Sequence, residues 1–186
     1  MCIRDSVEEP PDADAVVLAT GARPYVPDLP VSEGFSTAWA VLRGSRPDGK
    51  RVVVADWGGD ASGLDASELL AASGYEVALA VGSAAFGETL HAYQRNLYAA
   101  RLYRAGIEVW HHLELAAWDG GRARFTNIFA PELEAVMEAD ALVLALGRVP
   151  VRELAVQGAV EVGDRLSPRS LEEAILEGSL AGRSLE

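Results

Sequence analysis

The residue types that could hold a ligand gather in a glycine-bearing turn after the apolar run at residues 52–55. Gly58, Gly59 and Gly63 follow that run, and a helix-like segment comes next. Glycines at such a turn let the backbone approach a diphosphate, which then rests on the N-terminus of the following helix. The pattern therefore predicts the opening strand–turn–helix of a dinucleotide-binding fold, with these three glycines as candidate cofactor-binding residues.

Acidic residues in the same turn argue against a bound diphosphate. Asp56 and Asp60 occupy positions that usually hold glycine. A carboxylate close to a diphosphate repels it, and any side chain also blocks the approach of the backbone. Asp60 and Asp65 instead suit the first helical turn, where they complement the helix dipole. Ser62 and Asp65 have the spacing of a capping box, which we expect at this helix start.

The end of the second strand gives a separate argument about the ligand. NAD sites usually place an acid there to bind the ribose, and NADP sites place an arginine nearby. This chain has Val81, Gly82 and Ser83 instead. We therefore expect NAD(P)H not to bind, and the domain to act as a scaffold or docking surface.

No other constellation in the sequence predicts catalysis or metal binding. His91, His111 and His112 lack metal-ligand spacing, and adjacent residues of a strand point to opposite faces. Cys2, the only cysteine, has no catalytic setting and cannot form an internal disulfide or hold an iron–sulfur cluster. We expect no catalytic residue and no metal ligand in this chain.

Composition excludes several classes of partner. The formal net charge of −12 argues against nucleic acid and anionic membranes, because such binding needs clustered Lys and Arg. No apolar run approaches the roughly 18–20 residues of a membrane span. There is no signal segment, so a cytoplasmic protein is expected.

Periodicity and turn residues predict an α/β chain of alternating strands and helices. Asp119, Gly120 and Gly121 are expected to join two antiparallel strands. The expected strands are residues 15–19, 52–55, 76–81, 107–110, 113–118, 122–129, 132–137, 141–146 and 159–162. The expected helices are residues 35–42, 62–73, 88–104 and 170–185.

Four short motifs in this order resemble the flavoprotein superfamily that has two dinucleotide-binding domains. They are residues 19–21 (Ala-Thr-Gly), the strand–turn–helix after Val52, residues 145–147 (Ala-Leu-Gly) and residues 162–164 (Val-Gly-Asp). The resemblance covers residues 14–186 and implies an NAD(P)-binding domain inserted into an FAD-binding domain. It predicts a Rossmann-like three-layer FAD/NAD(P)-binding fold with an antiparallel β-hairpin layer.

The same resemblance predicts the domain limits. Residues 1–13 are expected to be a non-native or disordered leader, because the first six residues fit nothing that follows. Residues 14–34 and 147–186 would be pieces of an incomplete FAD-binding domain, and residues 35–146 the inserted NAD(P)-binding-like domain.

It also implies further cofactor contacts. Gly163 and Asp164 would approach the flavin ribityl or an ADP group, giving a partial FAD or ADP site. Thr20, Gly21 and Gly147 would lie where the chain crosses between domains, with cofactor proximity as a secondary role.

Within the superfamily, the chain resembles the C-terminal part of old yellow enzyme-type NADH:flavin oxidoreductases. The nearest branch contains trimethylamine dehydrogenase, histamine dehydrogenase and N-methylproline demethylase, and tends to carry an acid where Asp56 stands. The resemblance implies that an upstream flavin barrel with FMN and an iron–sulfur cluster is missing. That barrel would be a partner from the same parent chain, with an electron-transfer protein as a second partner.

Three functions fit these residues. The first is the nucleotide-fold module of a flavin-dependent oxidoreductase, such as an amine dehydrogenase or demethylase, inactive alone and with a degenerate NAD(P) site. The second is the NAD(P)H-binding domain of a dienoyl-CoA reductase-like enzyme. The third is a non-enzymatic interaction domain with a degenerate Rossmann fold.

Overall fold

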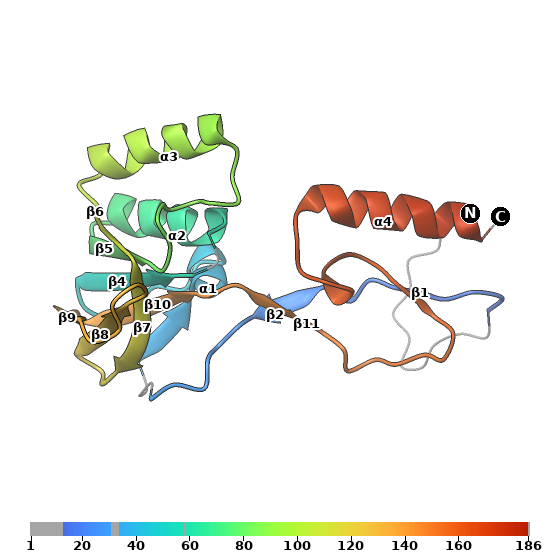
Figure 1. The fold of residues 1–186 in the computed structure, drawn as a ribbon, viewed down its shortest axis with the longest axis horizontal. Helices are drawn as coiled ribbons and strands as arrows, with labels where there is room; N and C mark the ends of the chain where they lie inside the picture. The colour runs from blue at the N-terminus through green and yellow to red at the C-terminus, as the bar shows by residue number, and fades with distance from the viewer. Residues whose placement is uncertain (1–12, 31–33, 58, 186) are drawn as a thin grey trace. The chain divides into compact units, whose positions relative to one another are not determined.

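The computed structural model describes residues 13–30, 34–57 and 59–185, so most of the expected leader and Gly58 lie outside the described residues (Figure 1). The chain forms two compact units. One spans Pro24–Gly147, and the other combines Met1–Arg23 with Arg148–Glu186. The division at residues 35 and 146 inferred from sequence stays a prediction.

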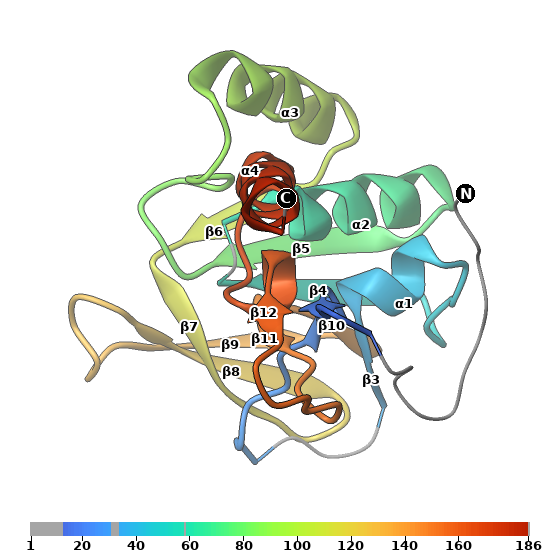
Figure 2. The same ribbon diagram turned by 90° about the vertical axis from the view of Figure 1, so that its right-hand side faces the viewer.

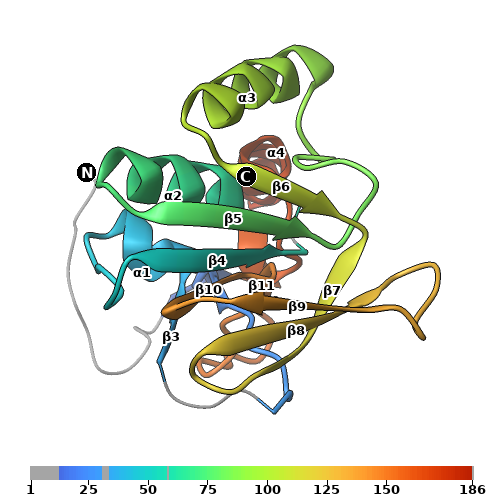
Figure 3. The same ribbon diagram turned by 90° about the vertical axis from the view of Figure 1, so that its left-hand side faces the viewer.

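The larger unit is built on a five-stranded parallel sheet with the order β3-β10-β4-β5-β6 (Figure 3). Its strands are β3 (Phe35–Thr37), β4 (Arg51–Asp56), β5 (Glu76–Val81), β6 (Glu108–His111) and β10 (Ala141–Ala145). The valine-rich β4 is central and buried on both faces, which explains why it reads as a continuous apolar run.

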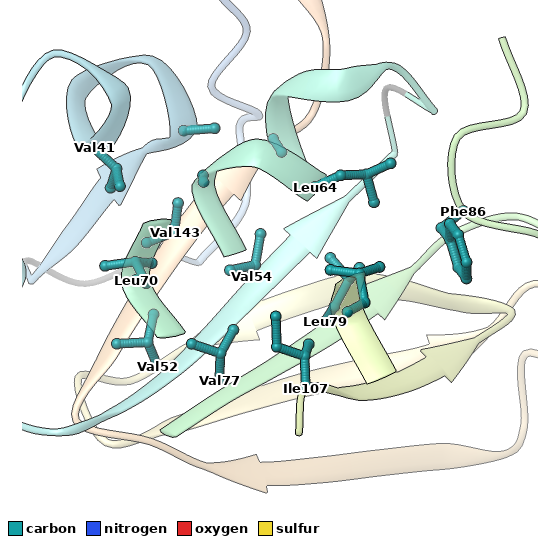
Figure 4. Packing of buried hydrophobic residues seen from close by; sticks show 14 of the residues in the cluster. Val41, Val52, Val54, Leu64, Leu70, Val77, Leu79, Phe86, Ile107 and Val143 are labelled. Atoms are coloured by element: carbon teal, nitrogen blue, oxygen red, sulfur yellow. The ribbon is translucent and has the colours of Figure 1, made fainter. Parts of the chain in front are cut away.

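Helices pack on one face of this sheet. They are α1 (Ala38–Leu42), α2 (Ala61–Ala72) and α3 (Ala92–Arg104). Val54 and Leu79 from the sheet meet Leu64 and Leu70 of α2 in a core without exposed side chains (Figure 4). Gly74 follows α2 with a φ of +90°, a left-handed conformation that lets the chain turn into β5.

An antiparallel sheet covers the opposite face. It consists of β7 (Leu113–Trp118), β8 (Arg122–Asn127) and β9 (Glu134–Glu138). Leu115, Trp118 and Phe125 pack against Val53 and Leu144 of the parallel sheet. The α/β three-layer fold with an antiparallel hairpin layer, predicted from the sequence, is confirmed.

The smaller unit contains two short strand pairs and a helix (Figure 2). Strand β1 (Val17–Leu18) pairs in parallel with β12 (Val160–Glu161), and β2 (Ala22–Pro24) pairs with β11 (Arg148–Pro150). A 3-10 turn, η1 (Gly163–Arg165), leads to α4 (Leu171–Ser184), which starts at a capping box between Ser170 and Glu173.

Two predicted elements differ clearly from the structure. Residues 35–42 were expected to be helical, but Phe35–Thr37 pairs with β10 and only Ala38–Leu42 is helix. The helix expected from residue 88 begins at Ala92, because the preceding residues form a turn bonded to Gly59. Among the described residues, none of the helices is long and apolar enough to cross a bilayer.

Candidate functional site

The carboxyl ends of β4, β5 and β6 meet at one edge of the sheet, where open α/β folds bind ligands. Asp56 ends β4 there with 1% of its surface exposed, and its Oδ1 accepts the Gly59 N–H at 3.2 Å. Gly59 has a φ of +61°, which glycine adopts without strain. The Asp56 carboxylate therefore holds the turn by an internal hydrogen bond.

A second carboxylate caps the helix after the turn. The Oδ1 of Asp60 accepts hydrogen bonds from the Ser62 N–H at 2.7 Å and from the Ser62 hydroxyl at 2.6 Å. Asp60 is thus the N-cap of α2, and the predicted capping box of Ser62 with Asp65 is wrong. Asp65 lies beyond the first turn and accepts the Tyr98 hydroxyl of α3 at 2.7 Å. The Asp60 carboxylate therefore occupies the positive N-terminus of α2, which would otherwise attract an anion.

Replacing Asp60 with alanine is expected to lower the free energy of unfolding by about 1 kcal/mol, because the Ser62 N–H loses its partner. Asp60→Asn should cost less, since its amide oxygen can still cap the helix. Chemical denaturation measures both variants. Asp48→Ala, at an exposed acid outside any helix, is the control, and an equal loss there would contradict the capping role.

Gly63 lies where α2 approaches the sheet most closely. A Cβ at Gly63 would lie 3.0 Å from Cγ of Asp56 and 3.1 Å from Cβ of Ala145. The residue therefore fills the role of a fingerprint glycine that lets helix and strand pack together. Its part in the fold does not require a ligand.

Residues 82–90 cover the turn from the side of β5. Thr89 donates two hydrogen bonds to the carbonyl of Gly59, from its N–H at 3.0 Å and its hydroxyl at 2.9 Å. A Cβ at Gly59 would lie 3.6 Å from Glu88. A Cβ at Gly82 would lie 2.8 Å from Cδ1 of Trp57, so the indole rests on the end of β5.

Tyr98 joins α3 to α2 next to this turn. Burial, helped by the hydrogen bond to Asp65, raises the pKa of the Tyr98 phenol to about 12, and Arg101 stacks 4.5 Å above the ring centroid. Because the pKa is raised in the folded state, the stabilisation is complete below 10.0, the ordinary pKa of a tyrosine. It should be lost as pH rises through about 12.

A titration of tyrosinate absorbance should therefore show a late step near pH 12 that comes from Tyr98. Tyr98→Phe should remove that late step and the loss of stability that accompanies it. Tyr103→Phe, on the exposed side of the same helix, is the matched control and should leave the late step in place.

In the smaller unit, Thr20 and Gly21 bond to the segment after β11. The Thr20 hydroxyl donates to the carbonyl of Val151 at 2.6 Å, and the Gly21 carbonyl accepts the Val151 N–H at 2.9 Å. Gly147, at the end of the larger unit, accepts the Tyr25 N–H at 3.0 Å. Gly21 and Gly147 have φ values of +74° and +88°, so both positions favour glycine.

The other two predicted contacts, Gly163 and Asp164, already have protein partners. The Gly163 N–H donates to Oε2 of Glu177 at 2.7 Å. Asp164 forms an ion pair with Arg148 at 2.6 Å and accepts the Arg169 N–H at 3.3 Å. The turn is thus held by side chains of the same unit.

Sequence reasoning missed Arg165, which organises this unit. It is 2% exposed and forms an ion pair with Glu161 at 2.8 Å. Its Nη1 also donates to the Thr20 hydroxyl at 3.2 Å and to the Val151 carbonyl at 2.9 Å. The spacing of four residues from Glu161 was the available signal.

The predicted ligand residues thus fall into two sets. Gly59 and Gly63 meet at the acidic turn of the larger unit, whereas Thr20 and Gly21 are joined through Arg165 to the η1 turn that contains Gly163 and Asp164. Across the part of the chain that the structure describes, no three His, Cys, Asp or Glu side chains are placed to hold a metal ion.

Comparison with known proteins identifies relatives of this arrangement. A sequence model of the pyridine nucleotide-disulphide oxidoreductase family matches residues 3–167. Among solved structures, histamine dehydrogenase from Rhizobium sp. 4-9 is similar with a TM-score of 0.83 and 21% identity over 92% of this chain. The 6-hydroxypseudooxynicotine amine oxidase of Pseudomonas geniculata N1 has a TM-score of 0.80 and 23% identity over 91% of the chain.

A metal reductase of Desulforamulus reducens is 43% identical over 61 residues, which is 32% of this chain. The chain spans only a fraction of these proteins: 30% of the histamine dehydrogenase, 29% of the amine oxidase and 9% of the metal reductase. At these identities the two solved structures show the fold alone.

Proposed function

Since the chain belongs to the pyridine nucleotide-disulphide oxidoreductase family, we propose that it is the nucleotide-fold module of a larger flavin-dependent oxidoreductase, with a degenerate NAD(P) site. The observation that carries the proposal is the Asp60 carboxylate, which caps α2 where the family's fold would place a diphosphate. Alone, the module is inactive, because the proposal assigns the chemistry to a flavin held elsewhere in the protein.

Three contacts support a degenerate site. The Asp60 carboxylate caps the helix terminus, and its negative charge repels a diphosphate. Thr89 saturates the Gly59 carbonyl with two hydrogen bonds and holds residues 82–90 over the turn. The Trp57 indole rests on Gly82, next to where a ribose would bind. NAD(P)H does not fit these residues without their rearrangement.

The proposed module also has a partial FAD or ADP site, in which protein side chains already bond to the candidate ligand groups. In the smaller unit the Gly163 N–H and the Asp164 carboxylate are the groups that would bind ribose or ribityl hydroxyls and phosphate. Both are engaged, by Glu177 and by Arg148. A bound flavin nucleotide would have to displace Glu177, so these residues fit the cofactor only after that exchange.

The branch of the family is proposed from the neighbours. Two similar structures are a histamine dehydrogenase and an amine oxidase, which suits an enzyme that oxidises an amine C–N bond. In this proposal FMN and an iron–sulfur cluster lie in an N-terminal flavin barrel of the same parent chain. An electron-transfer protein then receives the electrons.

The coding DNA upstream of the Val7 codon tests this proposal. We expect an open frame that encodes a barrel, a cysteine cluster and a strand followed by a Gly-x-Gly-x-x-Gly turn. An in-frame stop followed by a genuine start near Met1 would contradict it. That result would favour a separate interaction domain.

A further inference from the structure

A hollow of about 560 Å³ opens beside the β7–β8 hairpin of the larger unit, away from the acidic turn. Its walls come from Pro30, from the end of β7 at Ala117 and Trp118, and from β8 and β9. This volume is within the range of small-molecule sites, about 300–1,000 Å³. We infer that it binds a small carboxylate that carries an apolar group.

The charge of the hollow selects an anion. Arg122 and Arg124 line it, and Asp119 is its acidic residue. Asp119 is already neutralised by Arg122 at 3.0 Å, and the N–H groups of Gly121 and Arg122 hold the pKa of its carboxyl below the usual value. Because Arg122 and Asp119 neutralise each other, the net positive charge of the hollow comes from Arg124.

Arg124 is placed to receive the ligand. Arg124 is exposed, and within residues 13–30, 34–57 and 59–185 its guanidinium has no hydrogen-bond or ion-pair partner. Its cross-strand neighbours are Ala117 on β7 and Val136 on β9, both of which line the hollow. A guanidinium that shares a hollow with apolar residues suits a carboxylate, which it binds with two parallel hydrogen bonds.

The apolar walls decide between kinds of anion. Pro30, Ala117 and Val136 offer hydrocarbon surface next to the charge. A carboxylate can present an apolar body to such surface, whereas inorganic phosphate is charged and hydrated on all sides. Glu134 and Glu138 on β9 lie diagonally across from Arg124. Their negative charge weakens the binding of any anion, so the expected affinity is modest.

Benzoate is the probe, titrated into the full chain and followed by the amide NMR signals of residues 117–124. We expect saturable shifts, with Arg124→Gln weakening binding at least about tenfold, the loss of one charge-assisted contact. Arg104→Gln, at an exposed arginine on α3, should leave the affinity unchanged. Glu134→Gln should tighten binding by roughly twofold, because a like charge is removed.

Benzylamine and inorganic phosphate complete the test. Neither should bind as tightly as benzoate. Shifts that do not saturate, or an affinity unaffected by Arg124→Gln in a variant with unchanged near-UV circular dichroism, would overturn the site. Phosphate binding equal to that of benzoate would overturn the apolar part of the ligand.

Discussion

Replacing Trp118 with alanine is expected to lower the free energy of unfolding of the larger unit by about 3–5 kcal/mol. Trp118 is 1% exposed and lies between the parallel sheet and the β7–β9 sheet, in contact with the cluster that includes Phe125 and Leu144. Its Nε1 has no hydrogen-bond partner among the described residues, so the loss comes from packing and from the cavity left behind.

Urea denaturation followed by far-UV circular dichroism measures this loss. Trp110 is the matched control, because it is also a tryptophan at a strand but is 47% exposed. Trp110→Ala should cost less than about 1 kcal/mol. If both variants lost the same stability, the β7–β9 sheet would not be a packed layer of this fold.

Arg165→Met should destabilise the smaller unit by about 2–3 kcal/mol, somewhat less than a fully buried ion pair would cost, because Glu161 is 32% exposed. The change removes the donor that connects Glu161 with Thr20 and with the Val151 carbonyl. Methionine keeps much of the side-chain volume, so the loss reports the polar contacts rather than a cavity.

Hydrogen exchange of the Val160 and Val162 amides measures this effect locally, since they donate to the carbonyls of Val16, just before β1, and of Leu18 in β1. Their exchange should accelerate by roughly 30- to 150-fold, in proportion to the lost free energy. Arg23→Gln is the control, because its ion pair with Glu153 joins two side chains that are more than 60% exposed. Equal acceleration in the control would contradict the role of Arg165.

Much of the larger unit could be predicted because its strands are continuous apolar runs bounded by turn residues. Strands β5 and β7 have the predicted limits, Glu76–Val81 and Leu113–Trp118. The sequence could not predict β3, because three residues of mixed character become a strand only through pairing with β10. It also misplaced the start of α2, where Asp60 and Ser62 are both good N-cap residues and the backbone decides between them.

The candidate site shows the same division. That the turn is acidic follows from Asp56 and Asp60 alone. The contact of Trp57 with Gly82 joins residues 25 positions apart, and the hydrogen bond of Thr89 with Gly59 joins residues 30 positions apart. No local sequence pattern encodes such contacts. Arg165 was likewise hidden, since its Thr20 contact is 145 residues away in the sequence.

An equilibrium titration of the chain with NADH and with NADPH tests the degenerate site most directly. We predict no saturable binding up to about 1 mM, an affinity worth roughly 4 kcal/mol, because the Asp60 carboxylate and the Trp57 indole oppose the ligand. A dissociation constant in the micromolar range for either nucleotide would contradict the account and would favour a working NAD(P)H-dependent reductase domain.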